Sequence, residues 1–187
     1  GREGEVTPVF VYTNYPTAEL FINGKSYGKQ SKNNSSLKSR YRLMWMDAVY
    51  EPGEVKVVAY NKDGKAVAEK TVRTAGKPHH IELVSNRNEL TADGKDLAYV
   101  TVKVVDKDGN LCPTDSRLIH FSVKGAGKFR AVANGDPTNL EQFHLPKMHA
   151  FHGMLTAIVQ AGEIAGDLVL TAKASGVKTG TVHLQAK

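Results

Sequence analysis

Hydrophobic and polar residues alternate with a period of two along most of the chain. In Tyr99–Val104 the valines fall on one side and Tyr, Thr and Lys on the other, and segments 119–124 and 168–173 repeat this pattern. Successive side chains of a strand point to opposite faces, so such segments bury one face and expose the other. No window of a dozen residues shows a helical stripe. The pattern predicts an all-β protein of antiparallel strands.

Turn signals separate the alternating segments. Asn23-Gly24 lies between two strand-like runs and predicts a tight hairpin, because both residue types tolerate positive φ. Asp63-Gly64 and Asp108-Gly109 mark two further hairpins. Short strands with turns about every 8–12 residues are typical of a sandwich or barrel.

The best domain boundary is the segment Ala75–Pro78, which predicts domains at 1–76 and 77–187. Strands are expected in the first near 7–14, 18–23, 25–30, 41–47, 54–61 and 65–73. They are expected in the second near 79–84, 97–106, 118–124, 128–133, 154–160, 166–174 and 177–186. Each set suffices for an immunoglobulin-like β-sandwich, so the fold class is two tandem antiparallel sandwiches. The first is small enough to depend on its neighbour for stability.

Net charge is +6, and much of it comes from a stretch without acids between Glu19 and Asp47. Basic residues in this stretch could contact phosphates. They could equally protect a strand edge against aggregation, and no aromatic residues interleave the polar run at 31–36. The edge interpretation is favoured, and no nucleic-acid partner is expected. No apolar run approaches the ~18–20 residues needed to cross a bilayer.

Several motifs resemble metal, phosphate or catalytic sites, but each lacks a required part. Asp106–Asn110 resembles the start of a calcium loop, yet the twelfth position is Arg117 rather than glutamate. Gly125–Lys128 lacks the spacing of a phosphate loop. A histidine cluster (His144, His149 and His152) has no cysteine or helix to complete a zinc site. No cofactor or metal is therefore expected.

Two further residue types carry little chemistry. The acids are scattered over turns and solvent-facing positions, without the carboxylate pair that a glycosidase needs. Cys112 is the single cysteine, which excludes an internal disulfide and favours a packed or loop residue. The sequence therefore predicts no catalytic residue.

Trp45 is the only tryptophan and has two interpretations. With Tyr41 and Tyr50 it could form a platform that stacks on sugars. However, Trp45 and Leu43 share one face of an alternating segment, so a core position is favoured.

The order of motifs resembles the C-terminal region of bacterial family 2 glycoside hydrolases of the β-galactosidase type. The first domain carries VFVYTN at 9–14, AELFINGKSYG at 18–28, Trp45 and YEPGEVKVVAY at 50–60. The second carries LTADGKDL at 90–97, VVDKDGN at 104–110 and NGDPT at 134–138. The segment Phe151-His152-Gly153-Met154 departs from the Phe-Asn-Gly of the family pattern.

The resemblance implies an accessory region rather than an enzyme. In that family the two catalytic glutamates lie on an upstream barrel, which takes about 250 residues, so no catalytic residue transfers to this chain. The implied parent is a retaining hydrolase of β-galactosides or related glycans, periplasmic or secreted. Its catalytic and sandwich domains would be the partners of this chain, which would stabilise the barrel, shape the cleft or mediate oligomerisation. A glycan would be a further partner if the chain were a carbohydrate-binding module.

The segment 134–153 is the longest without alternation, and it contains four large apolar side chains, namely Phe143, Leu145, Met148 and Phe151. A loop of this length in a small sandwich is usually functional or disordered. We predict that these residues form an interdomain contact surface. The alternative, that they cover their own core, is equally favoured.

Two other function classes remain open. The segment 92–110 also resembles the tandem immunoglobulin-like repeats of bacterial surface adhesins, although the two halves of this chain are dissimilar. A carbohydrate-binding module would need exposed aromatic residues around one site. Its binding to sugars would be detected on a glycan array.

Overall fold

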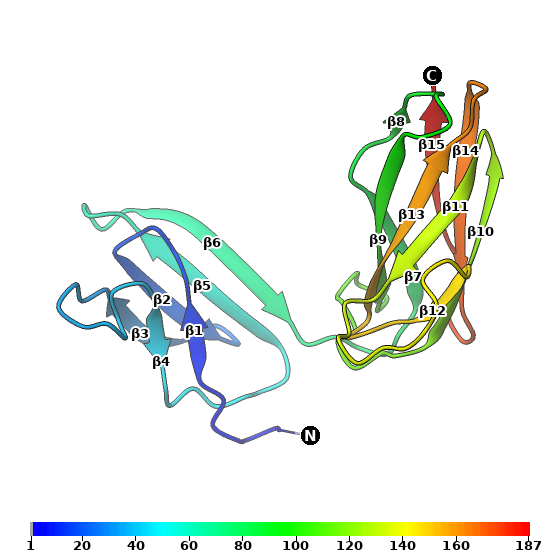
Figure 1. The fold of residues 1–187 in the computed structure, drawn as a ribbon. Coiled ribbons are helices and arrows are strands. Elements are labelled where there is room, and N and C mark those ends of the chain that lie inside the picture. The colour runs from blue at the N-terminus through cyan, green and yellow to red at the C-terminus, as the bar shows by residue number, and fades with distance from the viewer. Residues whose placement is uncertain (1) are drawn as a thin grey trace. The chain divides into compact units, whose positions relative to one another are not determined.

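The computed structural model describes residues 2–187, which form two compact units that divide between Thr74 and Ala75 (Figure 1). Strands and turns account for all regular structure in this range, and it contains no helix of the length and apolar character needed to cross a bilayer. The prediction of an all-β antiparallel sandwich fold is confirmed.

The first unit is a sandwich with layers of unequal width. Its strands are β1 (Val9–Val11), β2 (Thr17–Ile22), β3 (Lys25–Ser31), β4 (Leu43–Trp45), β5 (Glu54–Tyr60) and β6 (Ala66–Arg73). One layer is a four-stranded sheet in the order β3-β2-β5-β6, and the other holds only β1 and β4. Because β2 alternates strictly between buried and half-buried positions, Ala18, Leu20 and Ile22 enter the core.

Trp45 lies at the centre of that core. Only 2% of its surface is exposed, and its indole Nε1 donates a hydrogen bond to the Gly28 carbonyl oxygen at 3.0 Å. A buried indole usually finds such a partner. The core interpretation of Trp45 is confirmed, and Trp45 does not form a sugar-stacking surface.

The second unit contains nine strands in two sheets. They are β7 (His80–Ser85), β8 (Glu89–Leu90), β9 (Leu97–Val105), β10 (Leu118–Gly125), β11 (Gly127–Ala133), β12 (Lys147–His149), β13 (Met154–Ala161), β14 (Gly166–Lys173) and β15 (Gly180–Ala186). One sheet has the order β12-β10-β14-β15-β8 and the other β11-β13-β9-β7. Valines of β9 and leucines of β14 fill the space between the sheets.

The hairpin predicted at Asn23-Gly24 joins β2 to β3, with φ values of +49° and +80°. Asp63-Gly64 joins β5 to β6, whereas Asp108-Gly109 closes a turn whose only flanking pair is the bridge between Val105 and Leu111. The basic stretch lies on the edge strand β3 and the loop that follows it, where Lys29 Nζ sits 4.0 Å from the ring centre of Tyr60. The edge position of these lysines agrees with a protective role.

Candidate functional site

The predicted contact loop connects β11 to β13 and contains the short strand β12. Its first turn is built by Asp136, whose carboxylate accepts hydrogen bonds from the backbone N–H of Thr138 at 2.8 Å and its hydroxyl at 2.7 Å. These bonds hold the pKa of Asp136 below its ordinary value. The loop is therefore shaped by specific polar contacts from its first residues.

Two further contacts close the loop onto the second unit. The Glu141 carboxylate contacts Nδ1 of His149 at 3.0 Å and accepts the backbone N–H of the same residue at 3.1 Å. The carbonyl of Phe143 accepts the backbone N–H of Val132 at 2.8 Å. The middle of the loop is thus attached to β12 through Glu141 and to β11 through Phe143.

The four apolar residues expected at a contact surface divide between surface and core. Phe143 is 56% exposed and Leu145 is 36% exposed. Met148 is fully buried, because β12 pairs with β10 and places Met148 opposite Ile119; this residue belongs to the core and not to the surface. Phe151 is half-buried beside His152.

Leu140 extends the exposed surface and was not among the predicted residues. Its side chain is 97% exposed, the highest value of any large apolar residue described. In the sequence Leu140 lies between Asn139 and Glu141 and has no apolar residue two positions away. This pattern could have indicated an exposed side chain outside a strand. We call Leu140, Phe143 and Leu145 the loop surface.

The loop ends in a two-residue hairpin at His152-Gly153. Phe151 and Met154 exchange backbone hydrogen bonds of 2.9 and 3.0 Å, and the residues between them have φ values of +51° and +73°. This geometry favours Asn-Gly, which explains why Asn is expected in the family pattern. Here His152 adopts it, and its Nδ1 contacts the Pro113 carbonyl at 3.2 Å.

The histidines of this region do not come together. Within residues 2–187 no three side chains of His, Cys, Asp or Glu lie close enough to hold a metal ion. His149 contacts Glu141 and His152 contacts Pro113, as described above.

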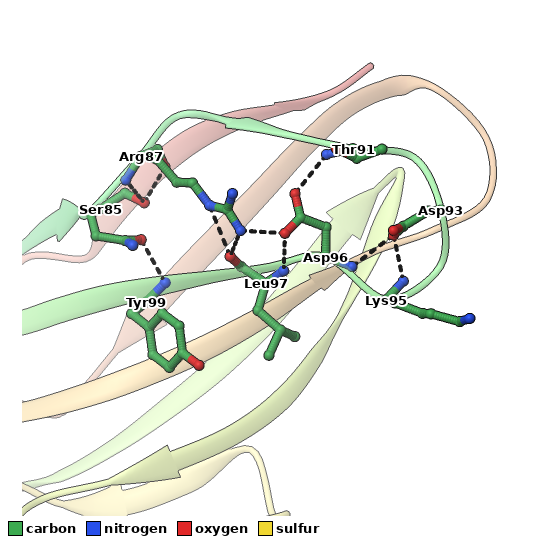
Figure 2. A network of polar contacts seen from close by, with 9 residues as sticks. Ser85, Arg87, Thr91, Asp93, Lys95, Asp96, Leu97 and Tyr99 are labelled. Carbon is green, nitrogen blue, oxygen red and sulfur yellow. Dashed lines mark hydrogen bonds and ion pairs between the residues drawn. The ribbon is translucent and has the colours of Figure 1, made fainter.

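The aspartates of LTADGKDL shape a loop at another part of the second unit, as Figure 2 shows. Asp93 accepts the backbone N–H groups of Lys95 and Asp96, each at 2.8 Å. Asp96 accepts the backbone N–H of Thr91 at 2.8 Å and also contacts the Arg87 guanidinium. These bonds lower the pKa of both aspartates, which act as acceptors that fix the loop.

Among residues 2–187, Asp106 is the charged residue with the lowest exposure, at 2%. Its carboxylate accepts the backbone N–H of Gly76 at 2.8 Å, the Asn110 side-chain amide at 3.0 Å, and the backbone N–H groups of Asn110 and Asp108 at 2.8 and 2.9 Å. These bonds, and that from Gly76 above all, hold the pKa of Asp106 far below its ordinary value. Both oxygens therefore accept hydrogen bonds, from the turn at 106–110 and from Gly76.

Comparisons with known proteins agree with this structural picture. Residues 81–183 match the model described as glycoside hydrolase family 2 C-terminal domain 5, and residues 4–68 match a domain of unknown function. A β-galactosidase of Bacteroides ovatus is 42% identical over 176 residues, which cover 94% of this chain and 20% of that protein. A β-glucuronidase of Formosa agariphila is 26% identical, covering 98% of this chain and 18% of that protein.

A solved family 2 member from Bacteroides cellulosilyticus superimposes with a TM-score of 0.89 and 33% identity, covering 100% of this chain and 24% of that one. The chain spans about a fifth of the length of the curated relatives it matches. It belongs to glycoside hydrolase family 2 and corresponds to a C-terminal region of the β-galactosidase and β-glucuronidase enzymes of that family.

Proposed function

We propose that the chain is a non-catalytic accessory region of an enzyme that hydrolyses β-galactosides or β-glucuronides. The observation that carries this proposal is that nearly the whole chain aligns with only a fifth of a β-galactosidase. A catalytic barrel requires about 250 residues and alternating helices, which two β-sandwiches do not supply. The higher identity to the galactosidase favours β-galactosides over β-glucuronides.

The acid–base chemistry of the chain supports a structural role. A glycosidase needs a general acid whose pKa is raised, paired with an ionised carboxylate. Each carboxyl group with a resolved shift here has a lowered pKa, namely Glu19, Asp93, Asp96, Asp106, Asp115 and Asp136. Burial opposes this shift at Asp115, but its hydrogen bonds from Arg117 outweigh burial. These groups are suited to accept hydrogen bonds and not to donate protons.

The accessory role would be exerted through the loop surface of Leu140, Phe143 and Leu145. Exposed apolar residues held in fixed positions by polar contacts are typical of interaction sites. The partner would be the catalytic or sandwich domain of the same polypeptide, and contact there would stabilise the barrel or shape its cleft.

The test uses the full polypeptide, meaning the complete enzyme of which this chain is proposed to be a part. It is compared with a form that lacks residues 1–187 and with a Phe143→Ser variant of the complete enzyme. Deletion of residues 1–187 is expected to lower the melting temperature or the kcat/KM of the enzyme, and the Phe143→Ser variant should show part of the same loss. The control is Ile164→Ser, because Ile164 is also exposed but lies outside the loop surface. Hydrogen exchange of residues 140–152 should be slower in the full polypeptide than in residues 1–187 alone. Unchanged stability, kcat/KM and exchange would contradict the proposed role.

A second candidate function is glycan binding. Tyr12 and Tyr41 are both largely exposed and line one shallow hollow with Thr13, Asn14 and Lys32. Aromatic faces beside amide and ammonium donors suit a sugar ring. Binding on a glycan array that is lost in Tyr12→Ala and Tyr41→Ala would favour this function, whereas binding that survives both changes would exclude this hollow.

A further inference from the structure

The sandwich of the first unit has a layer that is too narrow for the sheet it covers. An immunoglobulin-type sandwich of seven strands divides them four and three. Here the larger sheet has four strands, but the covering layer has only β1 and β4. The covering layer is one strand short.

The burial of the larger sheet shows where the strand is lacking. Ile22, Val55 and Val72 form one row across β2, β5 and β6, in directly paired positions. Burial falls along this row: Ile22 is 3% exposed, Val55 is half-buried, and Val72 is 62% exposed. The covering layer therefore ends above β5 and leaves the inner face of β6 open.

A groove of about 410 Å³ occupies the uncovered position. It is lined by β1 on one side and by β5 and β6 on the other. Its apolar residues include Val9, Val11, Val55, Val57 and Val72, and β6 also contributes the charged Glu69 and Lys70 to the lining. Strand β4 contributes no lining residue, so β1 separates it from the groove.

Backbone groups along the groove point to the kind of occupant. Strand β1 pairs with β4 alone, so among the described residues its other edge has no strand partner. Strand β6 is likewise the outer strand of its sheet. Free edges beside an apolar floor are the features that bind an added strand, in which backbone hydrogen bonds give affinity and alternate side chains fill the floor.

We infer that the groove receives a β-strand from the part of the same polypeptide that lies outside residues 1–187. The strand pairs with the free edge of β1 and directs every second, apolar side chain onto Val55, Val57 and Val72. This inference rests on the proposed function, since it takes the chain to be part of a longer family 2 enzyme. The relatives hold about four-fifths of their length outside the matched region, so a tethered strand is present at high effective concentration.

The test uses hydrogen exchange and two matched substitutions on β6. Exchange at residues 9–12 and 66–73 is expected to be at least about tenfold slower in the full polypeptide than in residues 1–187. Val72→Arg should remove this protection and lower the melting temperature of the full polypeptide. In residues 1–187 alone, Val72→Arg should change the melting temperature by no more than about 2 °C relative to the unsubstituted protein, because Val72 is already exposed there. Val67→Arg is the control, since Val67 lies on the same strand but does not line the groove.

Two outcomes would overturn the inference. Equal exchange in both proteins, with Val72→Arg no more harmful than Val67→Arg in the full polypeptide, would show that the groove stays open. Dimers of residues 1–187 in sedimentation that Val72→Arg abolishes would make a second copy the occupant. The proposed accessory role is contradicted by a different result, namely that removal of residues 1–187 from the full polypeptide changes neither its stability nor its kcat/KM.

Discussion

Replacement of Trp45 by alanine is expected to unfold the first unit and leave the second folded. Trp45 is the largest fully buried side chain in the protein, and it joins β4 to β3 through its hydrogen bond to Gly28. The cores of the two units are separate clusters, so loss of one should not disturb the other.

The magnitude follows from burial and the hydrogen bond. Truncation of a buried tryptophan to alanine costs about 3–5 kcal/mol. Loss of the indole hydrogen bond adds about 1 kcal/mol. A unit that ends at Thr74 has a total stability of about 4–11 kcal/mol, at roughly 0.05–0.15 kcal/mol per residue. Because one layer of this unit is incomplete, the low end of that range applies, and the variant should be largely unfolded there.

Hydrogen exchange on residues 1–187 measures the two units separately. In Trp45→Ala the strands at 17–22 and 54–60 should exchange rapidly, while those at 97–105 and 154–161 stay protected. Tyr41→Ala is the control, because Tyr41 is 66% exposed and its loss should change neither unit. Continued protection of β2 and β5 in Trp45→Ala would refute the core argument, and loss of protection in both units would refute their independence.

Three further predictions concern the second unit. Lowered aspartate pKa values mean that the folded state binds fewer protons, so this stabilisation is complete above the unfolded-state pKa of about 3.9 and is lost as the pH falls below it. The melting temperature should fall as the pH drops below about 4 in the wild type, and less steeply in Asp106→Asn. Gly153→Ala should lower the melting temperature more than Gly109→Ala, because both positions have positive φ but only the former places a Cβ 2.3 Å from the Cys112 carbonyl oxygen; equal effects would contradict this. A chelator should leave the melting temperature unchanged, and a drop reversed by calcium or zinc would reveal an ion site.

Alternation in the sequence was enough to predict the long strands and the position of Trp45. In the segment 41–47 the shared face of Leu43 and Trp45 predicted two residues that are both buried. The strand itself is shorter, at 43–45, and the one predicted at 7–14 is reduced to 9–11. Strand ends depend on the length of the partner strand, and local alternation does not contain that information.

Two short strands were not predicted, for a related reason. The two-residue strand β8 pairs in parallel with β15, and β12 pairs with β10. Neither is long enough to show a period of two, so both depend on partners distant in the sequence. The burial of Met148 follows from the second pairing, which is why its residue type alone did not separate it from Phe143.

The incomplete layer of the first unit could not be predicted from a count of strands. Six expected strands are compatible with several divisions between two layers, and only the observed pairing shows four and two. The contacts of the aspartates in the family motifs could likewise be predicted only in part. Their positions at turns were predicted, but the number of backbone groups that each carboxylate accepts depends on segments far away, as Gly76 contacts Asp106.

The most direct test of a non-catalytic role is an activity assay of purified residues 1–187 with aryl β-galactosides and aryl β-glucuronides. No turnover above background is expected, because two β-sandwiches supply no barrel to hold a catalytic carboxylate pair. Asp93, Asp96 and Asp106 instead accept hydrogen bonds at turns, which lower the pKa of each. Turnover that disappears when one of the chain's own carboxylates is replaced by an amide would contradict the accessory role.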